Sequence, residues 1–190
     1  MATNVAFIML LVDPPARPPW FLRPALWIAR RMTGKDPLPG RLLAHFPKAA
    51  IAGGVLEALS AHGPGDLEAR VLKLARLAAS VTTGCPFCVD MNAGGHDAAG
   101  VSRADVDALL AGEDLAHAEP RERSAVALAR ALSATPIEVS PELRATLREV
   151  FSPREIVTLA STIAQVNYWA RLNQALGVPA AGFFEGCVPD

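Results

Sequence analysis

The sequence predicts an all-α fold in which several helices pack as a bundle. Apolar residues recur at helical spacing over most of the chain after residue 40, and no convincing strand pattern occurs there. Helix-start signals and helix-stop glycines alternate along the same region and leave only short turns between them. Helices joined by short turns bury their apolar faces against one another, so a bundle-like domain is the expected architecture.

Residues 1–39 are expected to form an N-terminal arm that carries one short helix. Val5 to Val12 is an apolar run that suits a short strand or an extended segment packed on a neighbour. Four prolines follow and forbid regular structure: Pro14, Pro15, Pro18 and Pro19. The segment Trp20 to Met32 is then predicted to form a short helix. The aromatic and basic residues up to Lys35 also suit membrane-surface binding, but we favour packing of the arm on a partner subunit.

Residues 40–190 are expected to form the main helical domain. A first helix covers Arg41 to Ser60, with Pro47 as a break point, and a Gly63-Pro64-Gly65 turn follows. The next helix is capped by Asp66 and carries an apolar seam made of Leu67, Val71, Leu74, Ala78 and Val81. Further helices are expected from Cys85 with Gly100 as the stop, after Ser102, over Arg121 to Ser133, after Ser140, and from Ser152 to Leu176 before Gly177.

The composition is that of a globular protein with surplus apolar surface. Apolar residues make up 51% of the chain and the mean hydropathy is +0.25, which is high for a soluble monomer and predicts a homo-oligomer. The net charge of -1 gives no sign of nucleic-acid binding. Val5 to Val12, the longest apolar run, is too short for a membrane span and lacks the flanks of a signal peptide. We therefore expect a soluble, cytoplasmic protein with neither a membrane nor a nucleic acid as partner.

Cys85-Pro86-Phe87-Cys88 is the motif that carries chemistry. Residues three apart share one face of a helix, so the two thiols can meet as a disulfide. Pro86 suits the first helical position, which places both thiols at a helix N-terminus, where unpaired N–H groups and the helix dipole favour a thiolate. The thiolate is the reactive form of cysteine, and the motif therefore indicates redox chemistry rather than two buried structural cysteines.

Two other interpretations of the cysteines are weaker. A thioredoxin-like motif follows a strand in a βαβ unit, whereas this motif follows a helix. A structural zinc site needs four ligands, and His96 with Cys187 does not form a second pair at a recognisable spacing. Cys187 lies near the end of the chain and is expected to be free. We expect no metal and no cofactor.

The stretch from Leu72 to Ser102, LKLARLAASVTTGCPFCVDMNAGGHDAAGVS, resembles the alkylhydroperoxidase D-like, or carboxymuconolactone decarboxylase, family. The tail SPREIVTLASTIAQVNYWARLNQALGV looks like the last long helix of peroxidase-related members. The resemblance implies an all-helical, usually trimeric or hexameric fold that reduces a small peroxide through the cysteine pair. It also implies a dithiol or thiol-carrier reductant, and it assigns the attack to Cys88 and the resolution to Cys85. The arm before residue 40 has no counterpart in the resemblance.

Two positions depart from the family's pattern. Peroxidases of the family have a glutamate twelve residues before the first cysteine and a histidine four after the second, and these residues relay protons. This chain has Lys73 and Asn92 at those positions. Asparagine does not exchange a proton near neutral pH, and lysine is a poor base unless it is desolvated. On a helix that continued to Gly100, His96 would lie on the same stripe as Cys85, Cys88 and Asn92 and is the substitute to consider.

The sequence therefore predicts a thiol peroxidase with an incomplete proton relay, whose candidate residues are Cys85, Cys88, Asn92, Lys73 and His96. Lys73 and His96 can each also be explained without a role in catalysis. Lys73 also suits a solvated basic face with Arg70 and Arg76, and His96 suits an exposed position near a helix end. The main alternative function is a redox sensor or binding scaffold of the same fold. A lactone decarboxylase is a weaker alternative, because the family's decarboxylases generally lack the cysteine pair.

Overall fold

The computed structural model describes residues 10–59 and 67–185, and both ranges contain helices and no β-strand. The all-α prediction is thereby confirmed. The elements are η1 (Trp20–Leu22), α1 (Arg23–Thr33), α2 (Leu38–Leu43), α3 (Pro47–Leu59), α4 (Ala69–Thr83), α5 (Pro86–Ala93), η2 (Asp97–Ala99), α6 (Arg103–Leu110), α7 (Pro120–Ser133), α8 (Pro141–Val150) and α9 (Pro153–Leu176). None of the helices in these ranges combines the length and apolar character that a bilayer crossing requires.

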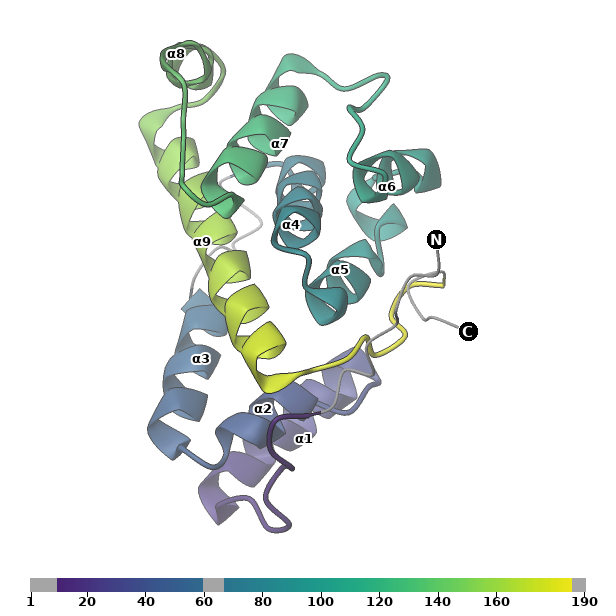
Figure 1. Ribbon diagram of the computed structural model, residues 1–190, viewed down its shortest axis with the longest axis vertical. Helices are drawn as coiled ribbons and strands as arrows, with labels where there is room; N and C mark the ends of the chain where they lie inside the picture. The colour runs from purple at the N-terminus through teal and green to yellow at the C-terminus, as the bar shows by residue number, and fades with distance from the viewer. Residues whose placement is uncertain (1–9, 60–66, 186–190) are drawn as a thin grey trace.

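Helix α4 is the centre of the main domain and packs against α5, α6, α7 and α9 (Figure 1). Its predicted apolar seam is confirmed, because Val71, Leu74 and Ala78 are buried and Val81 is half-buried. Leu159 and Ile163 of α9 complete the same core. Helices α1, α2 and α3 lie at the end of the molecule that is opposite α8, and α9 runs from one end to the other (Figure 1).

The predicted helix starts after Ser102, Ser140 and Ser152 are all observed. In each case the serine side chain accepts a hydrogen bond from the backbone N–H three residues later. Ser102 and Ser152 form complete capping boxes with Asp105 and Glu155. Such caps satisfy helix N–H groups that have no partner inside the helix, so local sequence alone sets where these helices begin.

The cysteine helix begins where expected but ends early. Helix α5 starts at Pro86 and stops at Ala93, well before Gly100. Gly95 has a φ of 61°, a left-handed conformation that favours glycine. Gly94 lies against the backbone of Phe183, which a Cβ atom on Gly94 would approach to 2.9 Å. The double glycine therefore lets the C-terminal segment pack across the end of α5.

The expected helix from Arg41 to Ser60 is divided into α2 and α3, and Pro47 is the first residue of α3. Proline is favoured at that position because it needs no hydrogen-bond partner for its nitrogen. The expected domain boundary at residue 40 falls inside α2. Most of Val5 to Val12, the Gly63-Pro64-Gly65 turn and Cys187 lie outside the described residues, and Leu10 to Val12 are not in a strand. The predicted Asp66 cap is wrong, because the N-cap residue of α4 is Glu68.

Both ends of the described chain pack beside the cysteines. Leu42 and Val178 are buried in one apolar cluster with Cys85 and Cys88, and Leu10, Leu38, Ala181 and Phe183 pack against that cluster. The segment after α9 runs between α5 and the pair α1 and α2 (Figure 1). Asp90 of α5 is fully buried and fixes this segment, because its carboxylate accepts the backbone N–H groups of Ala181 at 2.7 Å and Phe184 at 2.9 Å.

Candidate active site

The two cysteines form a buried dithiol at the start of α5. Cys85 is the N-cap residue and Pro86 the first helical residue, as the motif predicts. The exposed fractions of Cys85 and Cys88 are 0% and 1%, and both cysteines are free thiols. Their Sγ atoms lie 2.7 Å apart, and the Cys88 N–H donates to the Cys85 Sγ at 3.2 Å. The sulfurs can thus become a disulfide with little movement of the backbone.

The hydrogen bonds make the two thiols chemically unequal. The hydrogen bond between the two thiols lowers the pKa of Cys85, and the backbone N–H groups of Cys88 and Phe87 act in the same direction against the effect of burial. The same hydrogen bond raises the pKa of Cys88, and burial raises it further. One proton therefore lies between the two sulfurs, and the negative charge of the singly ionised pair rests on Cys85.

Asn173 of α9 is a member of the site that the sequence did not reveal. Its Nδ2 atom lies 3.7 Å from the Cys88 Sγ, and this contact lowers the pKa of Cys88 in opposition to the larger effects. An amide nitrogen donates, so the Cys88 sulfur is the acceptor of this contact. Asn173 lies 85 residues after Cys88, and no spacing in the sequence connects them.

Asn92 lies one turn after Cys88 and contacts its backbone rather than its sulfur. Its Nδ2 atom donates to the Cys88 carbonyl and to the Ser80 hydroxyl, each at 2.9 Å. Its Oδ1 atom accepts from Arg76 Nε at 3.2 Å. These bonds tie α5 to α4, and they give Asn92 a positioning role for the helix that carries the thiols.

Lys73 points to the far end of α5. Its Nζ atom donates to the Gly94 carbonyl at 2.5 Å. Burial lowers the pKa of Lys73 to about 8, and the charge of Arg76 acts in the same direction. The expected solvated basic face is wrong, because all three cations have protein partners: Arg70 pairs with Asp105 and Glu122, and Arg76 pairs with Glu57 and Asn92.

His96 is not on the cysteine helix, so the stripe predicted for it is wrong. The residue follows Gly95 and caps η2. Its Nδ1 atom is hydrogen-bonded to the Val101 carbonyl at 2.7 Å, and its ring meets the edge of Phe184 at a centroid distance of 5.9 Å. The predicted stripe fails because Gly94 and Gly95 end α5 before the chain reaches residue 96. Both contacts give His96 a structural role at this connection.

Glu57 of α3 is a second residue that the sequence did not reveal. Its Oε2 atom accepts from Gln165 Nε2 at 2.6 Å and from Trp169 Nε1 at 3.0 Å. Its Oε1 atom lies 3.9 Å from Arg76 Nη2, and Arg76 contacts Asn92 in turn. A carboxylate is therefore connected to the cysteine helix through Arg76, although it comes from α3 and not from the position of Lys73.

An apolar cavity of about 240 Å³ lies beside the dithiol. It is bounded by α1, α2, α5, α9 and the C-terminal segment, and it includes Leu26, Phe87, Met91, Trp169, Asn173 and Phe183. Asn173 connects it to the thiols, because the same side chain lines the cavity and contacts the Cys88 sulfur. Molecules in this cavity would approach the pair from the side of Cys88.

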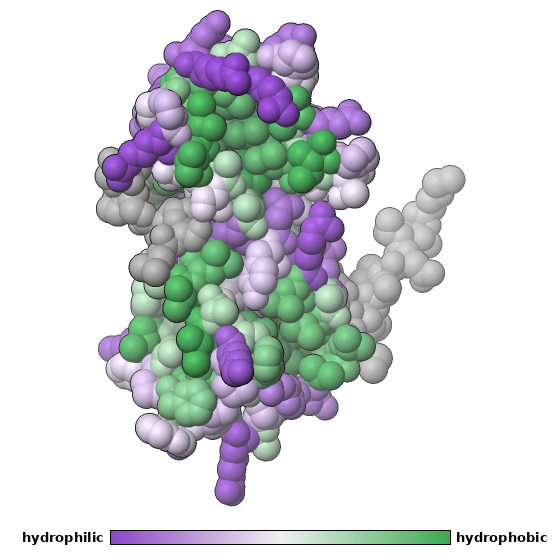
Figure 2. All heavy atoms as spheres, turned by 90° about the vertical axis from the view of Figure 1, so that its left-hand side faces the viewer, coloured by the Kyte–Doolittle hydropathy of each residue, from purple (hydrophilic) through white to green (hydrophobic). Residues whose placement is uncertain are grey.

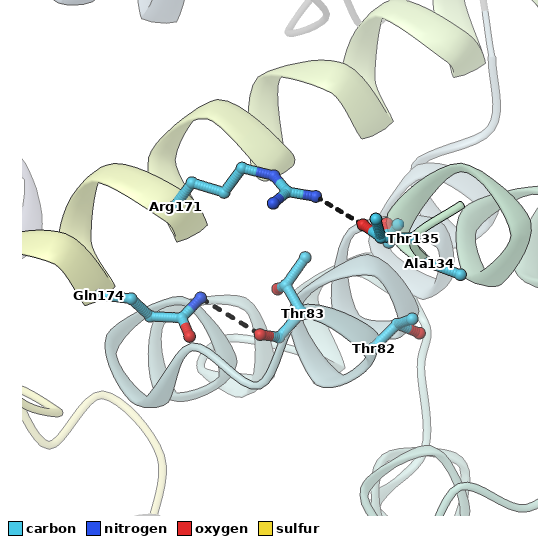
Figure 3. A pocket seen from close by; sticks show the side chains of 7 residues that line it. Thr82, Thr83, Ala134, Thr135, Arg171 and Gln174 are labelled. Atoms are coloured by element: carbon cyan, nitrogen blue, oxygen red, sulfur yellow. Dashed lines mark hydrogen bonds between the residues drawn. The ribbon is translucent and has the colours of Figure 1, made fainter. Parts of the chain in front are cut away.

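A second cavity, of about 500 Å³, lies where the ends of α4 and α7 meet α9. Its lining is mostly polar, and two hydrogen bonds cross it: Arg171 donates to Thr135, and Gln174 donates to the Thr83 carbonyl (Figure 3). The residues that line it include no cysteine, histidine or carboxylate, so this cavity offers no group for redox or acid–base chemistry. Within the described residues, no group of three or more His, Cys, Asp or Glu side chains is placed to hold a metal ion.

Comparison with known proteins gives a family match over part of the chain. The Carboxymuconolactone decarboxylase family matches residues 49–131, which include the dithiol. The uncharacterized protein YdfG of Bacillus subtilis (strain 168) is 29% identical over 110 residues, which are 57% of this chain and 75% of YdfG. A protein of unknown function from Agrobacterium tumefaciens is 27% identical, with a TM-score of 0.66 over 73% of this chain and 94% of its own.

Two further solved structures share the fold at lower identity. A peroxidase-related protein from Ralstonia eutropha JMP134, described as an alkylhydroperoxidase AhpD core, has a TM-score of 0.77 at 22% identity over 94% of this chain and 97% of its own. The debrominase Bmp8 has a TM-score of 0.73 at 24% identity over 91% and 93% of the two chains. The chain is thus similar to the carboxymuconolactone decarboxylase family over residues 49–131, and it has the alkylhydroperoxidase D-like helical fold.

Proposed function

We propose that this protein is a thiol-dependent oxidoreductase that reduces a peroxide through Cys85 and Cys88. The observation that carries the proposal is the contact of 2.7 Å between the two free sulfurs at the N-terminus of α5. A pair held in this way can give up two electrons by closing a disulfide. The cycle needs an external dithiol or thiol-carrier reductant and a reducing compartment such as the cytoplasm.

In the first step the Cys88 sulfur attacks one peroxide oxygen. The O–O bond breaks, Cys88 becomes a sulfenic acid, and the alkoxide or hydroxide that leaves takes up a proton. The Cys85 thiolate then attacks the Cys88 sulfur, the disulfide closes, and the hydroxide that leaves takes up a proton from the buffered solvent to become water. The dithiol has lost two electrons and the peroxide has gained them. The external dithiol then reduces the disulfide and completes the cycle.

The Cys85 thiolate acts as the base for the attack, a role that neither Lys73 nor Asn92 fills. The pKa of Cys85 is lowered and that of Cys88 is raised, so in the singly ionised pair Cys88 keeps its proton and can donate it to the Cys85 sulfur 2.7 Å away. As Cys88 attacks, this proton passes to Cys85, which releases it to the leaving oxygen and becomes a thiolate again. We assign the attack to Cys88 because the apolar cavity reaches the pair through Asn173 on the Cys88 side.

A thiol titration combined with a turnover assay tests the proposed function. The Cys187→Ser variant serves as the starting protein, so that only the two motif thiols are counted. One equivalent of peroxide is expected to remove both thiols, and a dithiol reductant is expected to restore them and to sustain turnover. Persistence of both thiols, with no turnover on any peroxide, would contradict the proposal.

Single variants test the order of the two sulfurs. Cys88→Ser is expected to give no sulfenic acid, as measured by trapping with a dimedone probe and mass spectrometry. Cys85→Ser is expected to accumulate the sulfenic acid on Cys88, because the resolving thiol is gone, and to form it about a hundredfold more slowly, because the internal base is gone. A sulfenic acid found on Cys85 in the Cys88→Ser variant would reverse the assignment.

A redox sensor is the second candidate, and the burial of both sulfurs favours it. Thiols with exposed fractions of 0% and 1% react slowly with large reductants. A sensor would close the disulfide with peroxide but show no sustained turnover with any dithiol, so the same assay separates the two functions. Reductive debromination, the activity named for Bmp8, is a further reaction that a dithiol beside an apolar cavity can support. Release of bromide from an aryl bromide would reveal it.

A further inference from the structure

The polar cavity where α4 and α7 meet α9 is lined by a cation that has no anionic partner. Arg171 of α9 is exposed and reaches across the cavity to α7, where its Nη2 atom donates to the Thr135 hydroxyl at 3.2 Å (Figure 3). Among the residues that the structure describes, no carboxylate lines the cavity or pairs with Arg171. A guanidinium carries five N–H donors, so most of the Arg171 hydrogens remain available to a ligand.

Two hydroxyl groups beside Arg171 also have hydrogens to donate. The Ser133 oxygen accepts from Asn167 Nδ2 at 2.9 Å, and the Thr135 oxygen accepts from Arg171. Neither hydroxyl donates to an acceptor within residues 10–59 or 67–185, although Ser133 has an exposed fraction of only 5%. Buried polar groups in native proteins normally have their hydrogen-bonding capacity satisfied. An acceptor atom of a bound molecule would satisfy the Ser133 hydroxyl.

The α4 side of the same cavity offers acceptors instead of donors. The hydroxyls of Thr82 and Thr83 donate to carbonyls of their own helix, so toward the cavity their oxygens can only accept. The Gln174 amide nitrogen is also fully used, because it donates to the Thr83 carbonyl and to a carbonyl of α9. A molecule that fills the cavity therefore meets donors on the side of α7 and acceptors on the side of α4.

The ends of the two helices account for only part of this arrangement. Helices α4 and α7 both end at the cavity, and the partial negative charge of a helix C-terminus attracts a cation such as Arg171. That attraction explains why an arginine lies here. It does not explain why the hydroxyl of Ser133, which is buried beside Arg171, has no acceptor for its hydrogen.

We propose that this cavity binds a small organic anion, whose carboxylate or phosphate group accepts hydrogen bonds from Arg171, Ser133 and Thr135. A guanidinium suits such oxyanions because its charge strengthens the hydrogen bonds. The volume of about 500 Å³ has room for more than an inorganic ion, and the oxygens of Thr82 and Thr83 suit hydroxyl groups on the ligand. The ligand is therefore a hydroxylated acid or a polyol phosphate. The inference is independent of the proposed function, because no redox group lines this cavity.

Titrations of the full-length protein followed by NMR test the chemistry of the ligand. Glycerate and glycerol 3-phosphate carry the two kinds of anionic group, and at least one of them should shift the Arg171 Nε–H signal and the amides of Ser133 and Thr135 in a saturable way. Glycerol, which has no charge, should not bind. Ethyl phosphate, which lacks the hydroxyls, should bind at least about threefold more weakly than glycerol 3-phosphate.

Two outcomes of these titrations would contradict the proposal. Absence of saturable shifts at the Arg171 signal with both glycerate and glycerol 3-phosphate would overturn the anion site. Equal binding of ethyl phosphate and glycerol 3-phosphate would overturn the preference for a hydroxylated ligand.

A matched pair of arginine variants locates the binding. Arg171→Gln keeps a polar side chain but removes the charge, and it should weaken binding of glycerol 3-phosphate at least about tenfold. Arg148→Gln removes the same charge from an exposed position of α8 outside the lining, and it should leave binding unchanged. Equal losses in the two variants would show that the anion responds to the charge of the whole surface and not to this cavity.

Urea unfolding separates ligand binding from a purely structural role of Arg171. Glycerol 3-phosphate should raise the unfolding midpoint of the unchanged protein and of Arg148→Gln, because a ligand of the folded state stabilises it, and should raise that of Arg171→Gln much less. If Arg171 only neutralises the ends of α4 and α7, Arg171→Gln will lower the midpoint in plain buffer, and the phosphate will affect all three proteins equally. That second result would overturn the proposal.

Discussion

Lys73 is partly buried, and its surroundings destabilise its charged form. Burial and the nearby charge of Arg76 lower its pKa from 10.5 to about 8. Its Nζ atom donates a hydrogen bond to the neutral carbonyl of Gly94, which does not balance the charge. Lys73 therefore fixes the end of α5 and loses its proton more readily than an exposed lysine.

We predict that the free energy of unfolding rises between pH 8 and pH 10.5 because of Lys73. In this window the folded protein has released the Lys73 proton and the unfolded chain still holds it, so the unfolded chain binds more protons and stability increases with pH. Below pH 8 both states are charged and this contribution is constant. Urea unfolding at several pH values should therefore show a smaller rise in Lys73→Met than in the unchanged protein.

Lys48→Met is the control for that measurement, because Lys48 is an exposed lysine of α3. In this variant the free energy of unfolding should depend on pH as it does in the unchanged protein. That dependence also includes the titration of the two thiols. If Lys73→Met and Lys48→Met show the same pH dependence, Lys73 does not lose its proton early in the folded state.

Helix α5 carries the two thiols, and its contacts with other parts of the fold stabilise it more than its own internal hydrogen bonds do. It has only eight residues, which is too short for a helix to be stable alone. Asn92 ties it to α4 through Ser80 and Arg76, and Asp90 ties it to the C-terminal segment. The geometry of the thiols therefore depends on both of these attachments.

We predict that Asp90→Ala lowers the free energy of unfolding by at least about 2 kcal/mol, because it leaves the buried N–H groups of Ala181 and Phe184 without an acceptor. Hydrogen exchange at these two amides should accelerate as well. The measurements are urea unfolding and amide exchange by NMR. Asp107→Ala is the matched control, since Asp107 forms only an exposed i,i+4 pair with Arg103 and should cost less than about 0.5 kcal/mol. Equal losses in the two variants would show that Asp90 does not anchor the segment.

Helix α3 presents an apolar surface to the outside of the whole molecule. Ile51 and Val55 are each 51% exposed, and Phe46 before the helix is 61% exposed. Figure 2 shows hydrophobic side chains gathered on the face that lies to the left in Figure 1, where α3 and α9 are found. Apolar surface of this kind commonly becomes a subunit interface, which agrees with the oligomer that the composition predicts.

We predict a homo-oligomer that uses the exposed side of α3. Light scattering after gel filtration should give a mass well above the chain mass of 20.0 kDa at micromolar concentration. Ile51→Asp with Val55→Asp should shift the mass toward a single chain, because charges would be buried at the interface. Ile137→Asp, in the connection between α7 and α8, is the control and should leave the mass unchanged. A mass near 20.0 kDa for the unchanged protein would contradict the prediction.

Much of the fold follows from local signals. Ser102, Ser140 and Ser152 begin helices because a serine caps the helix on its own C-terminal side, and Gly177 ends α9 because its φ of 69° suits glycine. The placement of Cys85 and Cys88 in one turn follows from their spacing and Pro86. The end of α5 did not follow, because Gly94 and Gly95 terminate it together with the packing of Phe183, a residue far away in the sequence.

By itself, the sequence determined that the protein is helical, where most helices begin, and that two thiols meet at the start of one of them. These properties depend on hydrogen bonds and spacings within a few residues. Only the tertiary structure decided what surrounds the thiols: Asn173 beside Cys88, Glu57 connected through Arg76, His96 turned away, and an apolar cavity partly walled by α1. These neighbours come from distant parts of the chain, and packing of whole helices, which no local pattern encodes, brings them together.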